Sequence, residues 1–145
     1  MTTLDEIQIR QLVEEKAAGL RARDPKAMVA AYANQVVIFN LAPPLQQPKD
    51  ARDTGPIEQW LSGFHGPMDT EVRDLRITVG GDVAFCTSLN CLTATPHGEE
   101  QSFSLWHRIT LGLQKIDGSW QITHEHESVP FEMDGSFRAS TGLKP

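Results

Sequence analysis

The chain has 145 residues, of which 39% are hydrophobic and 22% are charged, and its formal net charge is −6. This length suits one domain with its own core, so we expect a single domain over residues 1–145. There is no run of Lys or Arg, which argues against nucleic acid and anionic membrane as partners, and no apolar stretch suits a signal peptide or a membrane span. We therefore expect a cytoplasmic protein.

Three helices are predicted in the first half of the chain. In the first, apolar residues recur at every third or fourth position among good helix formers. The second opens with Asp24 as N-cap and Pro25 at the first helical position, and the third opens at 53–56. A β-branched strand over 36–39 and a proline-containing loop over 41–52 separate the last two. The predicted helices span residues 4–23, 25–32 and 55 to 63 or 66.

Beyond Met68 the pattern changes to that of β-strands. Glycine-containing turns at 80–82 and 117–118 separate them. Helices followed by an antiparallel sheet predict an α+β fold in which three N-terminal helices pack on one face of the sheet. The predicted strands span residues 71–79, 83–95, 101–116 and 120–129.

The two cysteines are predicted to be packing residues. Cys86 and Cys91 lie five residues apart in one predicted strand, so their side chains point to opposite faces and cannot easily form a disulfide. They form no CxxC pattern, and a free cysteine usually packs as a small hydrophobic residue.

A two-residue turn at 117–118 predicts the register of the last hairpin. The pairs expected on the helix-covered face are Ile116–Ser119, Leu113–Ile122, Leu111–His124, Ile109–His126 and His107–Ser128. The pairs expected on the opposite face are Arg108–Glu127 and Thr110–Glu125, with Trp106 nearby. The helix-covered row thus becomes polar towards one end, which indicates either a lined pocket or histidines satisfied by backbone or water.

Two segments resemble a known family. They are Arg23-Asp24-Pro25 leading to Tyr32-Ala33 and a strand ending at Asn40, and residues 117–130, DGSWQITHEHESVP. They resemble the SnoaL-like and ketosteroid isomerase-homologue family, and the second segment is also similar to the association domain of calcium/calmodulin-dependent kinase. The resemblance covers nearly the whole chain and implies a cone-shaped fold with a strongly curved antiparallel sheet, which hosts isomerases, cyclases, hydrolases and non-catalytic assembly domains.

The resemblance places the general-base aspartate of the ketosteroid isomerases on Asn40 and their oxyanion-stabilising tyrosine on Lys16. An amide cannot accept a proton at neutral pH, so steroid isomerisation is not expected. Lys16 interrupts the apolar stripe of the first helix and points either to solvent or inward. If it points inward, burial lowers its pKa and it becomes an anion anchor or a base. Trp60 is interpreted as a core residue, with the pocket wall as the alternative.

The alternation His124-Glu125-His126 could also be part of a metal site, because it presents two imidazoles on one side of a strand. His107 would be the third ligand, since it is expected diagonally across from His126. Two imidazoles do not make a site, and no carboxylate is expected on their face. We therefore predict neither a metal nor another cofactor.

Two hypotheses for function stay open. The first is a cofactor-independent isomerase, cyclase or hydratase in which His124 or His126 exchanges a proton with a carbonyl compound beside Asn40. Its ligand would be small, partly apolar, and bear a carbonyl or carboxylate. The residues expected to contact it are Lys16, Trp60, His107 and Ser128. The second is a non-catalytic ligand-binding or assembly module like the kinase association domain. In either case we expect a homodimer through the sheet face that bears Trp106.

Overall fold

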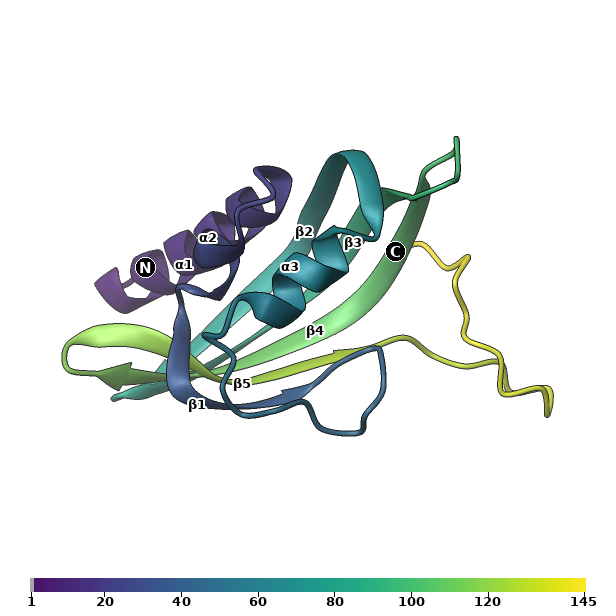
Figure 1. The fold of residues 1–145 in the computed structure, drawn as a ribbon. Coiled ribbons are helices and arrows are strands. Elements are labelled where there is room, and N and C mark those ends of the chain that lie inside the picture. The colour runs from purple at the N-terminus through teal and green to yellow at the C-terminus, as the bar shows by residue number, and fades with distance from the viewer. Residues whose placement is uncertain (1) are drawn as a thin grey trace.

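The computed structural model describes residues 2–145, and this part of the chain forms three helices and five strands (Figure 1). The helices are α1 (Leu4–Arg21), α2 (Pro25–Val29) and α3 (Gly55–Leu61). The strands are β1 (Tyr32–Phe39), β2 (Phe64–Gly80), β3 (Val83–Pro96), β4 (Phe103–Ile116) and β5 (Ser119–Ser128). None of these helices is both long and apolar enough to cross a membrane. The predicted α+β class is confirmed.

Side-chain caps begin the first two helices. The predicted cap of α2 is confirmed, because Asp24 Oδ1 accepts a hydrogen bond from the backbone N–H of Ala27 at 3.3 Å. At the start of α1, Thr3 Oγ1 accepts from the backbone N–H of Glu6 at 3.2 Å. Each bond satisfies an N–H group that has no partner inside its helix, and so helps to define where that helix begins.

The strands form one sheet in the order β1-β5-β4-β3-β2. Neighbours are antiparallel except β1 and β5, which run parallel. The sheet is therefore mixed, whereas the sequence analysis predicts antiparallel strands throughout. The reason is that β2, β3 and β4 lie between β1 and β5 in the chain, so no tight turn imposes an antiparallel direction on that pair.

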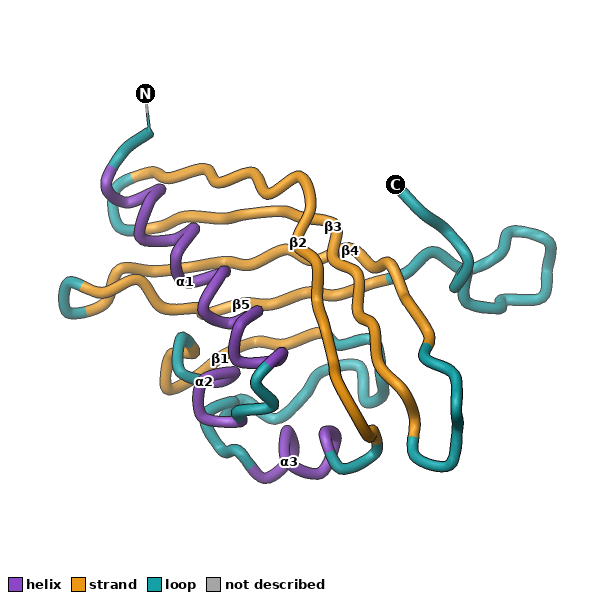
Figure 2. Tube along the Cα trace, turned by 90° about the horizontal axis from the view of Figure 1, so that it is seen from above, coloured by secondary structure: helices purple, strands orange, loops and turns teal. Residues whose placement is uncertain are grey.

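All three helices lie on one side of the sheet (Figure 1). Viewed from above, α1 runs across the strands (Figure 2). We call the helix-covered side the inner face and the opposite side the outer face. The helices thus decide which side chains of each strand are enclosed.

Two apolar clusters fill the space between the helices and the inner face. The larger one includes Ile9 of α1, Leu113 of β4 and Ile122 of β5, each at most 2% exposed. The smaller one lies around Met28 and Leu61. Burying one side chain of this size stabilises the fold by about 1.5–3 kcal/mol, so these clusters hold the helices on the sheet.

Both cysteines are buried and free, and they face opposite sides of the sheet as predicted. Cys86 belongs to the larger apolar cluster, whereas Cys91 pairs with Trp106 on the outer face. Burial raises the pKa of Cys86 to about 11, which keeps this thiol protonated at neutral pH.

The turn between β4 and β5 has the predicted two residues, Asp117 and Gly118, with φ of 51° and 82°. The predicted pairs confirmed next to the turn are Ile116–Ser119 and Leu113–Ile122. The register then shifts by one residue, because Gly112 pairs with His124. Thr123 is therefore an extra residue on β5, which makes this position a β-bulge.

The bulge reverses the two faces of β5 beyond Thr123. The predicted pairs Leu111–His124, Ile109–His126, His107–Ser128, Arg108–Glu127 and Thr110–Glu125 are wrong. The observed pairs are Leu111–Glu125, Thr110–His126, Ile109–Glu127 and Arg108–Ser128. Leu111 and Ile109 belong to the larger apolar cluster, so the two glutamates lie on the inner face. The two histidines and Ser128 lie on the outer face.

Candidate acid–base site

Polar side chains interrupt the apolar residues of the inner face. On β3, Ser88 and Asn90 lie between Cys86 of the larger cluster and Ala94 of the smaller one. On β4, His107 occupies the corresponding position, opposite Asn90. We call the whole set the polar band, and its members are Lys16, Tyr32, Ser88, Asn90, His107, Glu125 and Glu127.

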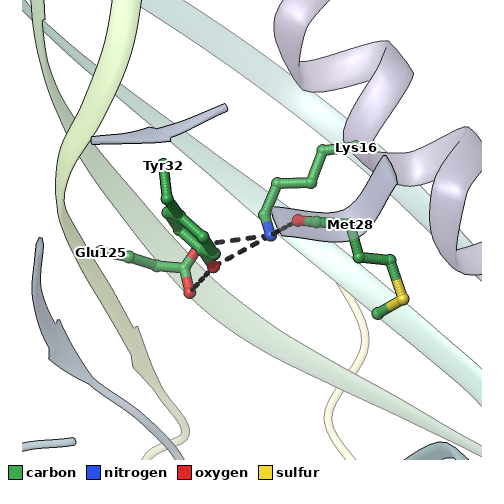
Figure 3. Close-up of polar contacts among 4 residues, drawn as sticks. All are labelled: Lys16, Met28, Tyr32 and Glu125. Carbon is green, nitrogen blue, oxygen red and sulfur yellow. Dashed lines mark hydrogen bonds and ion pairs between the residues drawn. The ribbon is translucent and has the colours of Figure 1, made fainter. Parts of the chain in front are cut away.

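One end of the polar band is a network that joins α1, β1 and β5 (Figure 3). Lys16 Nζ donates hydrogen bonds to the carbonyl oxygen of Met28 (3.1 Å) and to the hydroxyl of Tyr32 (3.0 Å). The Tyr32 hydroxyl in turn donates to Glu125 Oε2 at 2.9 Å. Lys16 Nζ also lies 3.8 Å from Glu125 Oε1. Of the two orientations left open for Lys16, the structure shows the inward one.

The network keeps Lys16 charged. Burial alone would lower the pKa of Lys16, but Tyr32 and Glu125 outweigh it and the pKa lies above its ordinary value. Lowering by burial, expected from the sequence for an inward lysine, is therefore wrong, because a carboxylate is buried beside it. Burial also raises the pKa of Tyr32, with Lys16 opposing this and Glu125 adding to it. At neutral pH, a neutral phenol thus bridges an ammonium and a carboxylate.

Glu127 is the member of the polar band whose charge changes near neutral pH. It lies opposite Ile109 on the inner face and is partly buried. Burial and the nearby Glu125 raise the pKa of Glu127 to about 7, although Lys16 lowers it. Both the protonated and the ionised form of Glu127 are therefore populated near pH 7, as proton transfer in both directions requires.

His107 is buried on β4 with only 8% of its surface exposed. Burial lowers the pKa of His107 and Glu125 partly restores it, so the imidazole is neutral at neutral pH. Its Nδ1 is buried without a hydrogen-bond partner, and so is Glu125 Oε1. The neighbouring Ser88 hydroxyl donates to Asn90 Oδ1 at 2.7 Å instead. The polar band thus contains two enclosed polar atoms that the protein leaves without hydrogen bonds.

The histidines predicted to be catalytic do not belong to the polar band. His124 Nδ1 is 2.7 Å from the carbonyl oxygen of Val37, so it donates to the parallel strand β1. The ring of Phe39 meets the rings of His124 and His126 edge-on, with centroid separations of 5.2 Å and 5.3 Å. His126 is exposed, and Ser128 Oγ accepts from Arg108 Nε at 3.1 Å.

Asn40 and Trp60 also lie outside the polar band. Asn40 is exposed just after β1, and its Oδ1 accepts a hydrogen bond from the backbone N–H of Leu41 at 2.8 Å. Trp60 is 39% exposed on α3 and packs edge-on against Phe64 at a centroid distance of 5.2 Å. Of the predicted site residues, only Lys16 and His107 belong to the polar band, while the rings of His124 and His126 lie 6.2 Å apart on the outer face.

Sequence reasoning missed Tyr32, Glu125 and Glu127 as site residues. The register predicted from the turn places Glu125 and Glu127 on the outer face, which is wrong. The signal that could have corrected this is Gly112, an isolated glycine inside the predicted strand 101–116. Such a glycine often marks a bulge or a close approach of another backbone.

Two hollows flank α1. One has a volume of about 340 Å³ and lies between α1, α2 and the β4–β5 turn, with Lys16 in its wall. The other, of about 410 Å³, lies between α1 and β2. Neither hollow is lined by His107, Glu125 or Glu127.

Within residues 2–145, no three His, Cys, Asp or Glu side chains are grouped so that they could hold a metal ion.

Residues 9–132 match the protein family described as SnoaL-like domain. No curated protein matches the chain. Among solved structures, an NTF2-like protein of unknown function from Pseudomonas putida KT2440 is 34% identical, with a TM-score of 0.86. That match covers 100% of this chain and 99% of the other.

Two more distant structures are similar in fold. A proposed scytalone dehydratase from Novosphingobium aromaticivorans DSM 12444 is 15% identical, with a TM-score of 0.77 over 98% of this chain and 96% of that one. A proposed calcium/calmodulin-dependent protein kinase II association domain from Xanthomonas campestris is 18% identical, with a TM-score of 0.69 over 83% and 84%. At these identities the likeness shows the fold alone.

Proposed function

The chain belongs to the SnoaL-like domain family, and we propose that it is a cofactor-independent enzyme that moves a proton on a carbonyl compound, as an isomerase, cyclase or hydratase does. The observation that carries this proposal is the position of Glu127. It lies on the inner face beside Glu125 and across from Ile109, and its pKa is raised to about 7. A general acid or base works best when its pKa is close to the working pH.

Glu127 would act in two steps. Its ionised carboxylate takes a proton from the carbon next to the substrate carbonyl, and the C–H electron pair moves towards the carbonyl oxygen to form an enolate. The protonated Glu127 then returns the proton to another carbon, or to a departing hydroxyl group that leaves as water. Either route restores the carboxylate, so the cycle needs no redox partner.

His107 is suited to hold the carbonyl oxygen. A neutral imidazole has one N–H donor. This donor can stabilise the negative charge of an enolate through a hydrogen bond while the imidazole keeps its proton. Burial keeps most water away from His107, and a hydrogen bond there is stronger than in water. This role replaces the one that sequence reasoning gives to His124 or His126.

The comparisons support the reaction class without defining the substrate. The proposed scytalone dehydratase shares the fold at 15% identity, so it supports dehydratase chemistry by analogy only. The residues of the polar band carry the proposal for this chain.

Deuterium exchange tests the proposal. The protein is incubated in D₂O with a panel of uncharged ketones, and NMR follows exchange at the carbon next to the carbonyl. We expect exchange faster than in buffer with at least one ketone, and a loss of about a hundredfold or more in Glu127→Gln. The control is Glu71→Gln, which removes a half-exposed carboxylate from the outer face.

Two results would contradict the proposal. One is that no ketone in the panel exchanges faster with protein than with buffer. The other is that Glu127→Gln retains the activity of the wild type. Either result would favour the non-catalytic binding or assembly module.

A further inference from the structure

We infer that the polar band recognises an uncharged or cationic ligand through a hydroxyl or amino group, and that it rejects carboxylates. This inference rests on the proposed function in one respect, because it takes the polar band as the place where the ligand binds. It narrows the substrate class from carbonyl compounds in general to those that also carry a hydrogen-bond donor.

Two buried polar atoms of the polar band make no hydrogen bond. His107 and Glu125 are only 8% and 6% exposed, and Nδ1 of the one and Oε1 of the other make no hydrogen bond. Buried polar atoms are nearly always paired, because an unpaired one loses its hydration without compensation. A ligand group that reaches either atom would therefore supply the hydrogen bond that this atom lacks.

The two atoms differ in the kind of hydrogen-bond partner that they need. A carboxylate oxygen only accepts hydrogen bonds, so Glu125 Oε1 requires a donor. Nδ1 of a neutral imidazole either accepts or donates, depending on the tautomer. A hydroxyl or amino group can donate to Glu125 Oε1, or to Nδ1 of His107 when the imidazole proton is on Nε2.

The polar band has more carboxyl groups than cations. Lys16 is its single ammonium among residues 2–145, and its Nζ is already bonded to Met28 and Tyr32 and paired with Glu125 (Figure 3). Glu125 and Glu127 supply two carboxyl groups against this one cation. A ligand carboxylate would therefore add negative charge beside Glu125 with no free cation to meet it, and burying such a charge is costly.

The apolar clusters on either side suit the rest of the ligand. Ile109 of the larger cluster and Phe103 beside the smaller one flank His107 along the inner face of β4. An apolar ring or chain would lie against one of them, while its hydroxyl or amino group reaches the polar band. The ligand would thus be amphiphilic, as are most molecules that fill sites of this kind.

The test compares three probes of similar size that differ in charge: 2-phenylethanol, 2-phenylethylamine and phenylacetate. NMR chemical-shift titration of the labelled protein at slightly alkaline pH measures their affinities and shows which residues respond. We expect the alcohol and the amine to bind about tenfold or more tightly than phenylacetate, with shifts at His107 and Glu125. Glu125→Gln should weaken the amine more than the alcohol, because it removes the charge but keeps an acceptor. Glu71→Gln should change neither.

Three results would overturn the inference: phenylacetate binding as tightly as the alcohol, shifts confined to residues outside the polar band, or no binding of alcohol and amine at tens of millimolar. The wild-type comparison decides the matter even if Glu125→Gln does not fold. The alcohol and the amine have no carbonyl, so their binding does not depend on catalysis. If the protein catalysed deuterium exchange of a ketone but bound phenylacetate tightly, only this inference would be contradicted. If it bound the alcohol selectively but catalysed no exchange, only the proposed function would be contradicted.

Discussion

A Cβ atom on Gly112 would lie 3.1 Å from Cβ of His124, which is closer than nine in ten real Cβ contacts. These two residues pair directly where β5 gains Thr123 as an extra residue. A glycine on β4 therefore leaves room for the bulge, and the bulge turns Glu125 and Glu127 to the inner face. A single glycine and a single extra residue thus determine which ionisable groups the helices enclose.

Replacing Gly112 should weaken the fold at this point. We expect Gly112→Val to lower the free energy of unfolding by about 1–3 kcal/mol, because its side chain overlaps His124. Gly80→Val is the matched control, since a Cβ at Gly80 would meet nothing within 4 Å. Urea denaturation measures both. Equal stability of the two variants would show that the close approach at Gly112 does not constrain the structure.

Lys16→Met should destabilise the protein by leaving Glu125 buried without its cation. The side chain of Lys16 is 24% exposed, so we expect a loss of about 2–4 kcal/mol, near the lower end of the cost for a fully buried pair. Lys26→Met is the control, because Lys26 is exposed on α2. Adding Glu125→Gln to Lys16→Met should restore part of the stability. A loss no larger than that of Lys26→Met would mean that the ion pair contributes nothing.

How much of this could be predicted from the sequence differs between local and long-range features. The cap at Asp24 and the turn at 117–118 depend on neighbouring residues, so local patterns identify these elements. Lys16 interrupts the apolar stripe of α1, and the pattern leaves two orientations open for it. The parallel pairing of β1 with β5 joins distant segments and leaves no local signal. The inner face of β5 was assigned by counting from the turn, and Thr123 inverted every position beyond it.

Glu127 should make the stability of the protein depend on pH. Its pKa in the folded state is about 7 against an ordinary 4.5, so the folded state binds this proton more tightly than the unfolded state. The resulting stability is fully present below about pH 4.5 and is lost as pH rises through about 7. Relative to the wild type, Glu127→Gln should gain about 2–3 kcal/mol of stability between pH 5 and pH 8. Urea denaturation at both pH values measures this, and a constant difference between the two proteins would contradict it.

We propose that a second copy of the chain covers the outer face. Val83 and Phe85 are 56% and 53% exposed there, and the Arg73 guanidinium lies 4.6 Å from the ring centre of Trp106. Exposed apolar groups on an uncovered sheet favour association. Sedimentation should show a dimer, and Phe85→Glu should give a monomer. Phe137→Glu, at a residue 75% exposed after β5, is the control. A wild-type monomer at high micromolar concentration would refute the dimer.

The most direct test of the account is an NMR titration of the glutamate side-chain carboxyl carbons in the ¹³C-labelled protein. Glu127 on the inner face should give a signal with its midpoint at about pH 7, and this signal should be absent in Glu127→Gln. The reasons for that value are the burial that the bulge at Thr123 imposes and the nearby Glu125. If every glutamate signal in the wild type titrated below about pH 5.5, as exposed carboxyl groups do, Glu127 would not be the enclosed acid–base group described above.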